Sequence, residues 1–293
     1  MSDNDTYLIK AGTTAHGPYE TDVDVERAGW AFSGIRVLAL GAGESETIDT
    51  GEDELLVLPL SGGCTVEAEG ATYDIAGRTD QWSEVTDYLY LPRETTATIT
   101  SAQGGRFALP SSRCTKRLEV TYCPIEKVNT SLRGAGPCSR QVNNYALGNE
   151  LKTDHLLVTE VLTPGGNWSS YPPHKHDEHN EVERELEEIY YFEVRKAPDG
   201  TDGFALQRVY PSPGHPIDVC CEIRDRDVVV MPYGYHGPSA AAPGYDLYYL
   251  NVMAGPAEDA TWLMTDDPDH AWVRGTWENQ DVDPRLPMTK PVN

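Results

Sequence analysis

Basic residues are scarce in this chain of 293 residues, which has 23 Lys and Arg against 47 Asp and Glu and a formal net charge of −24. Because nucleic acids bind to basic surfaces, this composition argues against a nucleic-acid partner. Apolar runs of transmembrane length are absent, and residues 1–6 contain neither the basic nor the apolar region of a secretory signal. We therefore expect a soluble, cytoplasmic protein without a membrane partner.

Cysteine occurs only six times, and no two cysteines form a C-x-x-C pair. Their irregular spacing does not resemble a disulfide framework, and the chain is long for a scaffold of that kind. We expect buried or incidental thiols.

Long helical periodicity is missing too. Short β-rich runs instead recur between 26 Gly and 21 Pro, which is typical of all-β sandwiches and barrels. The best helix candidate, Asp177–Glu187, is so polar that it predicts either a solvated surface helix or a loop. The predicted strands are Ile35–Leu40, Glu54–Leu60, Cys64–Ala68, Leu89–Pro92, Thr96–Thr100, Arg117–Tyr122, Leu156–Leu162, Ile189–Val194, Ala205–Tyr210, Val219–Ile223, Val228–Met231 and Asp246–Val252.

Histidine is nearly absent from the first half of the chain, where His16 is the only one before residue 140. This asymmetry predicts two domains, 1–140 and 141–293, with the chemistry in the second. The polar stretch 129–144 (NTSLRGAGPCSRQVNN) contains Gly and Pro and predicts a linker between them.

Three tryptophans, Trp262, Trp272 and Trp277, lie in an acidic C-terminal tail. Tryptophan is more often packed than exposed, so we expect the tail to dock on the body or on a neighbouring subunit. We also expect a homo-oligomer.

Two histidines separated by one residue, His174 and His176, follow Pro172-Pro173. The proline pair excludes a helix interior and favours a strand. Residues i and i+2 of a strand point to the same face, so both imidazoles would aim at one point.

A third histidine, His236, follows the apolar strand candidate 227–231 inside the turn Pro-Tyr-Gly-Tyr-His. Glu188 opens another β-rich run. Three imidazoles and one carboxylate suit a divalent cation, with zinc as our first choice and manganese or iron as alternatives.

The carboxylate of this set has two rivals. Glu181 lies in a polar segment that predicts a solvated face. Glu187 precedes Glu188 directly, and strand alternation places it on the opposite face. We choose Glu188 because it shares a face with Tyr190 and Phe192 in an apolar run.

The H-x-H pair, the following Glu and the P-x-G-x-H turn together resemble the two motifs of the cupin superfamily. Asp227 stands where the second motif usually has Gly, the Pro-to-His spacing is one residue short, and the spacer after His176 is long. The long spacer leaves the fourth ligand ambiguous: the spacer usual in cupins picks Glu181, whereas the strand context picks Glu188.

A longer set of motifs is similar to the 5-deoxy-glucuronate isomerase family of myo-inositol catabolism. The resemblance implies a bicupin of two β-barrels with a metal in the second. It also implies conversion of 5-deoxy-D-glucuronate to 2-deoxy-5-keto-D-gluconate, an aldose–ketose isomerisation of a small sugar acid. The related 5-keto-4-deoxyuronate isomerases share the metal motif and are an alternative. The motifs are Ser169–Asp177, Leu186–Phe192, Gln207–Tyr210, Pro232–His236, Pro243–Gly255 and Asp267–Trp272.

Such a reaction needs a Lewis acid for the oxygens on C1 and C2 and a cation for the substrate carboxylate. We predict Arg208 as that cation, with Gln207 beside it, because an Arg within an apolar strand needs a partner. A structural ion pair is an equal alternative for Arg208, and Arg224 is the next candidate. Tyr190 and Tyr249 are candidate catalytic residues, with packing in the core as their alternative role.

Two further functions remain open at this point. An Fe(II) dioxygenase of the cupin fold would use similar ligands together with O₂. A non-catalytic sugar-binding cupin usually lacks metal ligands, and only the N-terminal half, without an H-x-H pair, fits that description. We expect that half to serve as a scaffold.

Overall fold

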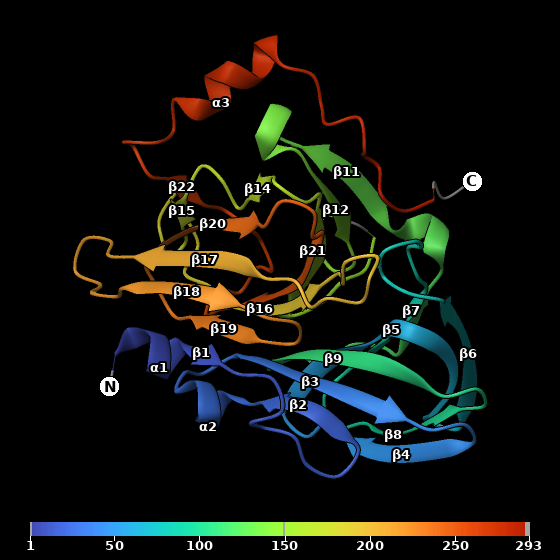
Figure 1. Cartoon of the computed structure of the whole chain (residues 1–293). Helices are drawn as coiled ribbons and strands as arrows, with labels where there is room; N and C mark the ends of the chain where they lie inside the picture. Colours follow the sequence, from blue (N-terminus) through green and yellow to red (C-terminus); the bar gives the residue numbers. More distant parts are fainter. Residues whose placement is uncertain (1, 149, 291–293) are drawn as a thin grey trace.

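The computed structural model describes residues 2–148 and 150–290, and almost all of its regular secondary structure is antiparallel β-sheet. Two barrel-like halves stack on each other, with the N-terminal half below and the C-terminal half above in Figure 1. The all-β prediction is therefore confirmed.

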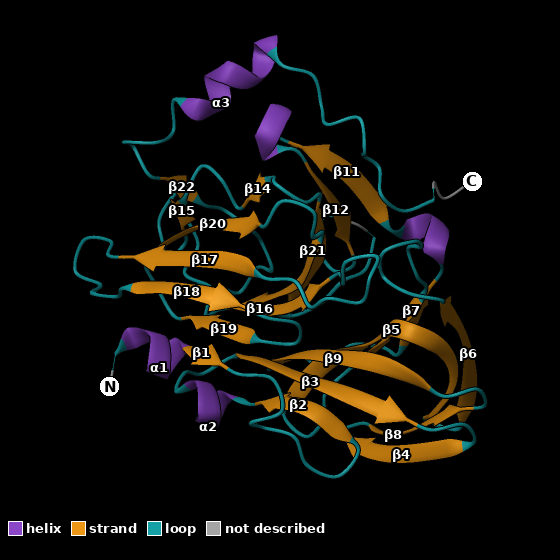
Figure 2. Ribbon diagram, viewed as in Figure 1, coloured by secondary structure: helices purple, strands orange, loops and turns teal. Residues whose placement is uncertain are grey.

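The N-terminal half is a nine-stranded sheet that encloses an apolar core. The sheet curves back on itself (Figure 2). Its strands are β2 (Tyr19–Val23), β3 (Ser33–Leu40), β4 (Glu44–Asp49), β5 (Asp53–Ala68), β6 (Ala71–Arg78), β7 (Tyr88–Leu91), β8 (Thr96–Ser101), β9 (Gly105–Arg113) and β10 (Thr121–Cys123).

The C-terminal half has two facing sheets, of seven and six strands. The first runs in the order β1 (Leu8–Ile9), β19 (Val228–Met231), β16 (Glu187–Val194), β21 (Leu247–Ala254), β13 (Leu157–Thr163), β12 (Arg140–Asn144) and β11 (Asn129–Arg133). The second contains β18 (Val219–Ile223), β17 (Ala205–Tyr210), β20 (Tyr235–Ala241), β15 (His174–Lys175) and β22 (Thr265–Asp266), with β14 (Trp168–Ser169) paired to β20.

Helices are short and peripheral in the described part of the chain, and none is long and apolar enough to span a membrane. The polar segment 177–186 forms a loop and not a helix. The helical elements are α1 (Asp3–Tyr7), α2 (Val25–Ala28), α3 (Val273–Thr276) and the single 3₁₀ turns η1 (Ile125–Lys127), η2 (Gly136–Cys138) and η3 (Trp277–Asn279).

The two predicted strands 54–60 and 64–68 are joined in β5, which bends at Gly62 and Gly63. A side chain on Gly62 would approach the carbonyl oxygen of Gly104 to 2.4 Å, and the φ angle of Gly62 is +74°. Only glycine tolerates both conditions, so the turn residues that suggested a break instead let one strand curve around the barrel.

The predicted linker 129–144 was wrong, because this segment forms β11 and β12. The two strands pair with each other, and β12 pairs with β13 in the C-terminal sheet. At the other end of the same sheet, β1 crosses from the N-terminal half to pair with β19. The division into domains at residue 140 stays a prediction.

Three large apolar cores fill the molecule, one inside each half and one between them. The core between the halves joins Leu56 and Leu58 of β5 to Ile189 of β16 and Leu250 of β21. Because burying apolar surface is the main favourable term in folding, the two halves stabilise each other.

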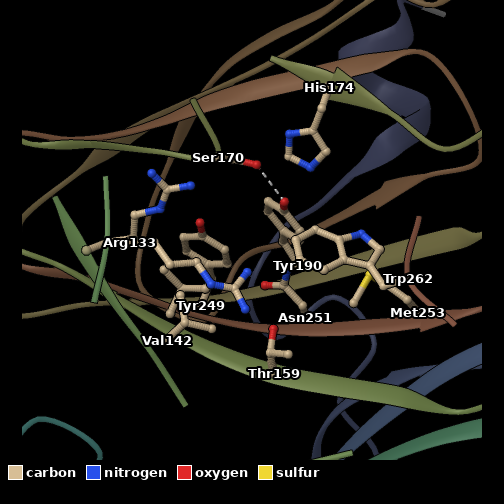
Figure 3. Close-up of a pocket in the computed structure, with 12 residues that line it drawn as sticks. Arg133, Val142, Thr159, Ser170, His174, Tyr190, Tyr249, Asn251, Met253 and Trp262 are labelled. Carbon is tan, nitrogen blue, oxygen red and sulfur yellow. Dashed lines mark hydrogen bonds between the residues drawn. The ribbon is translucent and has the colours of Figure 1, made fainter. Parts of the chain in front are cut away.

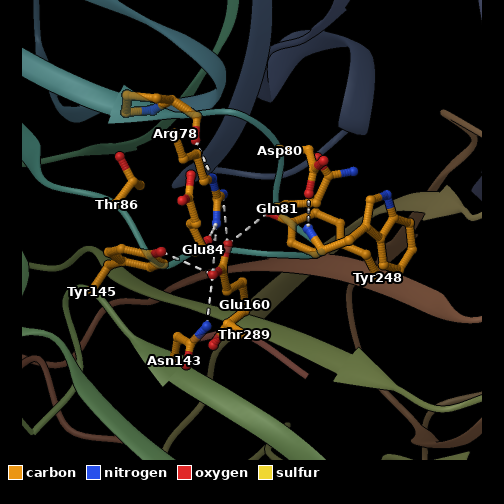
Figure 4. A network of polar contacts seen from close by, with 12 residues as sticks. Arg78, Asp80, Gln81, Glu84, Thr86, Asn143, Tyr145, Glu160, Tyr248 and Thr289 are labelled. Carbon is orange, nitrogen blue, oxygen red and sulfur yellow. Dashed lines mark hydrogen bonds and ion pairs between the residues drawn. The ribbon is translucent and has the colours of Figure 1, made fainter. Parts of the chain in front are cut away.

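A buried ion pair crosses this shared core. The guanidinium of Arg78 donates to both carboxylate oxygens of Glu160, at 3.0 and 2.8 Å, and both side chains are fully buried. Asn143 and Tyr145 donate to one oxygen of Glu160 and Tyr248 to the other (Figure 4). The network thus satisfies both carboxylate oxygens, as a buried charge requires.

A second buried carboxylate, Glu54 of β5, lies between the halves. It accepts hydrogen bonds from the backbone N–H groups of Asp154, His155 and Leu156 and from the hydroxyl of Tyr90. This contact fixes the chain immediately before β13, which contributes to the site described below.

We expect Arg78→Met to lower the free energy of unfolding by about 3–5 kcal/mol, because Glu160 would remain as a buried charge without its partner. Chemical denaturation would measure this loss. The control is Arg117→Met, which removes the exposed pair with Glu69 and should change stability by about 1 kcal/mol or less. Equal stability of the two variants would contradict the importance of the buried pair.

Candidate metal centre and cavity

Three buried histidines converge in the C-terminal half. His174 of β15 lies directly opposite His236 of β20 in an antiparallel pair. His176 follows two residues later on the same side. One nitrogen from each ring falls within 4.8 Å of the others, so the side chains could hold one metal ion.

Glu188, at the start of β16, completes this cluster from the opposite sheet. Its Oε2 lies 2.9 Å from Nε2 of His176 and 2.9 Å from Nε2 of His236. Asn251 of β21 donates to the other carboxylate oxygen at 2.8 Å, which fixes the orientation of the carboxylate. The structure thus brings together all four residues that the sequence predicts as ligands.

The rings are oriented by the backbone. Each Nδ1 faces a carbonyl oxygen, which favours the tautomer with hydrogen on Nδ1. The lone pair of each Nε2 is then available to coordinate a cation. Those carbonyls belong to Pro172, Leu186 and Gly234, at 3.4, 2.9 and 3.4 Å from His174, His176 and His236 respectively.

One buried nitrogen in this cluster lacks a hydrogen bond. Nε2 of His236 lies close to Glu188 but without the alignment that a hydrogen bond needs. An unsatisfied buried nitrogen that faces two imidazoles and a carboxylate fits a bound divalent cation.

Two of the four residues have pKa shifts that suit a bound cation. Burial, together with the nearby His236 and His176, lowers the pKa of His174 well below its ordinary value. Burial opposes ionisation of Glu188, but His236 and His176 outweigh it and lower the pKa of that carboxyl. At neutral pH the cluster therefore offers a neutral His174 and an ionised Glu188, the forms that bind metal.

The two rival glutamates lie elsewhere. The carboxylate of Glu187 turns toward the N-terminal half and accepts backbone hydrogen bonds from Ala31, Phe32 and Ser33 at 2.7–2.9 Å. Glu181 is exposed in the loop after His176. Strand alternation at residues 187 and 188 thus separates a residue that joins the halves from one that faces the histidines.

A network on the other face of β15 holds the histidine strand in place. Lys175 is buried and donates to Asp177 at 2.7 Å and to Glu183 at 2.9 Å. Asp177 also accepts from the hydroxyl of Ser212 and from the backbone N–H of Gly234, two residues before His236. Burial raises the pKa of Asp177, but these hydrogen bonds outweigh it and lower the pKa below the usual range.

A cavity of about 370 Å³, including its open mouth, adjoins the histidine cluster. In Figure 3, His174 and Ser170 lie at its upper side and Arg133 lies across from His174, with Tyr249 and Tyr190 between them. The residues that line the cavity are Arg133, Arg140, Val142, Thr159, Val161, Ser170, His174, Tyr190, Tyr249, Asn251, Met253 and Trp262.

Both predicted tyrosines reach this cavity. Their rings stack with centroids 4.6 Å apart, and the hydroxyl of Tyr190 lies 2.9 Å from that of Ser170. Burial is the main cause that raises the pKa of Tyr249, to about 12, and the pKa of Tyr190 well above its ordinary value. Both phenols are therefore neutral hydrogen-bond donors at neutral pH.

The structure does not bring Arg208 to the cavity. Alternation along β17 turns Gln207 inward and Arg208 outward, where it pairs with Asp218 and donates to the carbonyl of Val219. Arg208 thus has the structural ion pair that was its alternative role. Gln207 is buried and bonds to Ser239, and neither residue lines the cavity. Arg224 pairs with Glu222.

Sequence reasoning missed the two arginines that do line the cavity, Arg133 of β11 and Arg140 of β12. Both lie in the segment that was predicted as a linker. The available signal was the short spacing of the two arginines around Gly134 and Gly136, which suits a hairpin. The polar composition of the segment concealed it.

The three tryptophans of the C-terminal tail differ in their contacts and exposure. Trp262 lines the cavity, and its ring centroid lies 6.2 Å from that of His174. Trp277 packs against Arg140 and Arg274. Trp272 is 68% exposed, so the tail docks on the body through two of its three tryptophans.

Two β-barrels with a three-histidine cluster inside one of them define a bicupin. Oxalate decarboxylase from Bacillus subtilis superposes with a TM-score of 0.61 at 11% identity, covering 89% of this chain and 79% of its own, which supports the fold alone.

The family model described as the KduI/IolB family matches residues 7–273, and the chain belongs to this family. It is 38% identical to 5-deoxy-glucuronate isomerase of Geobacillus thermodenitrificans, covering 89% of this chain and 94% of that protein. The corresponding protein of Bacillus subtilis strain 168 is 35% identical over 86% and 91%. An IolB-like protein from Salmonella typhimurium has a TM-score of 0.83 at 36% identity, covering 91% of this chain and 98% of its own.

We expect His236→Ala to leave the protein folded but depleted of metal, with metal affinity at least about tenfold lower. Loss of a metal ligand costs more affinity than loss of a residue that only hydrogen-bonds to a ligand. Metal analysis after purification would measure the depletion. The control is His179→Ala, an exposed histidine of the neighbouring loop, which should keep its metal. Stoichiometric metal in His236→Ala would remove this residue from the ligand set.

Glu188→Gln should reduce kcat/KM by about 10- to 100-fold, because a neutral amide replaces a charged donor to the cation. Glu181→Gln should retain near-normal activity, since Glu181 is exposed. Steady-state kinetics on both variants would decide, and the reverse order of activities would identify Glu181 as the ligand.

Proposed function

We propose that this protein is an isomerase that converts 5-deoxy-D-glucuronate to 2-deoxy-5-keto-D-gluconate in myo-inositol catabolism. The observation that carries the proposal is the buried cluster of His174, His176, His236 and Glu188 beside a cavity, in a chain 35–38% identical to proteins named 5-deoxy-glucuronate isomerase. The reaction moves hydrogen between C1 and C2 of a sugar acid. Isomerisation of 5-keto-4-deoxyuronate is the alternative within the same family.

The four side chains would hold one divalent cation, zinc as our first choice and manganese or iron as alternatives. A bound cation of this kind polarises the oxygens on C1 and C2 as a Lewis acid. The protein contributes a rigid set of donors: the carbonyls behind the rings fix the histidines, and Asn251 fixes Glu188.

Tyr190 and Tyr249 would donate hydrogen bonds to the substrate from one wall of the cavity. Because burial keeps both phenols protonated, they suit stabilisation of an oxygen that gains negative charge and not removal of a proton. The hydroxyl of Ser170 forms a hydrogen bond with the hydroxyl of Tyr190 and would fix the direction of the Tyr190 hydroxyl.

The N-terminal half would act as a scaffold. Its contacts through Arg78 and the backbone of Ala31 end on β13 and β16, which carry residues of the site, and Glu54 binds the backbone just before β13. A cytoplasmic location and a homo-oligomeric state are further parts of the proposal.

The test is an NMR assay of the purified protein with 5-deoxy-D-glucuronate under anaerobic conditions. We expect conversion to the ketose without any redox partner, loss of conversion after chelation, and recovery when the metal is restored. Oxygen uptake with no anaerobic turnover would instead indicate the cupin dioxygenase. Binding without turnover in either condition would indicate a non-catalytic sugar-binding protein.

A further inference from the structure

We infer that Arg133 and Arg140 bind the carboxylate of the sugar acid and so orient its other end toward the histidine cluster. The inference rests on the proposed function for the identity of the substrate. It replaces the earlier prediction of Arg208, which lies outside the cavity.

Neither arginine has a carboxylate partner among residues 2–148 and 150–290. Arg133 donates only long hydrogen bonds of 3.4 Å, to Ser131 and Asn144. Arg140 donates to the carbonyl oxygens of Cys138 at 3.1 Å and Tyr171 at 3.4 Å. Both guanidinium groups are partly buried, and burial is the main cause that lowers the pKa of each.

Three other buried or half-buried arginines of this chain are neutralised. Arg78 pairs with Glu160, Arg106 pairs with Glu20, and Arg274 pairs with Asp266. The protein has 47 acidic residues, yet none neutralises the two arginines of the cavity. A partly buried cation without a counter-charge is unfavourable, so an anionic ligand is the natural partner of this pair.

Aromatic rings support both guanidinium groups. Arg133 lies over Trp262 at 5.3 Å, and Arg140 lies over Trp277 at 5.8 Å. Stacking of this kind holds the plane of a guanidinium while its N–H groups stay available at the edge. The docked C-terminal tail therefore prepares two planar forks, the geometry that suits bidentate binding of a carboxylate.

The cavity connects this cationic pair to the metal centre. Arg133, Arg140 and His174 line the same cavity, and Tyr249 lies in its wall. Burial is the main cause that raises the pKa of Tyr249; the negative charge of Glu188 raises it as well, and the positive charges of Arg140 and Arg133 lower it. An open-chain hexuronic acid has its carboxylate and its aldehyde at opposite ends. Binding the carboxylate at the arginines would leave C1 and C2 for the histidine cluster.

The test compares Arg133→Gln and Arg140→Gln with the wild-type protein in two measurements. Calorimetric titration with D-glucuronate and with uncharged D-glucose, on metal-loaded protein, measures recognition of the carboxylate without turnover. We expect affinity for D-glucuronate to fall by about 30-fold or more, the equivalent of about 2 kcal/mol, with weak binding of D-glucose unchanged. In turnover with 5-deoxy-D-glucuronate, KM should rise by a similar factor while metal content stays normal.

The matched control is Arg208→Gln, which removes a cation of the same barrel that already has a partner in Asp218. It should bind both sugars as the wild type does. The conservative variants Arg133→Lys and Arg140→Lys keep the charge but lose the fork, and should recover only part of the affinity. They also serve as the test if a Gln variant does not fold.

Unchanged D-glucuronate affinity and KM in both arginine variants would overturn the inference, as would an equal loss of affinity for D-glucose. The proposed function fails separately. If the wild type binds D-glucuronate through these arginines but does not isomerise 5-deoxy-D-glucuronate, the carboxylate site stands and the reaction is wrong.

Discussion

The pairing of β15 with β20 is the constraint on which the site depends, because it places His174 directly across from His236. A slip of one residue in this register would turn the histidines to the opposite face. β15 is only two residues long, so the strand itself contributes little to fixing the register. The buried network of Lys175, Asp177 and Glu183 supplies that constraint instead, since it ties the H-x-H segment to the backbone just before His236.

Two consecutive residues of β16 connect the interface between the halves to the metal centre. Glu187 bonds to the backbone of the N-terminal half, and Glu188 turns to the histidines. A strand that is fixed on one face by three hydrogen bonds has little freedom on the other. The N-terminal half, although it has no histidine cluster among its described residues, therefore contributes to the precision of the centre in the C-terminal half.

Most of the candidate metal centre could be predicted from sequence because strands have a period of two, and that period alone separates Glu187 from Glu188 and groups His174 with His176. The same rule left Arg208 undecided: it places Gln207 and Arg208 on opposite faces without saying which face is inside. The arginines of β11 and β12 escaped prediction for another reason. A polar hairpin at the edge of a sheet has the composition of a linker, and only its long-range pairing with β13 distinguishes the two. The continuity of β5 was also missed, because Gly62 and Gly63 predicted a break between two strands, whereas they allow one strand to bend and continue.

The pairing of β1 with β19 has a consequence for biosynthesis. Leu8 and Ile9 align with Val229 and Val228, so a segment near the start of the chain finds its partner only after most of the chain has left the ribosome. The core inside the N-terminal half can form earlier, from strands close to one another in sequence. Contacts between residues this distant in sequence slow folding. Until β19 has formed, Leu8 and Ile9 have no strand to pair with in the nascent protein.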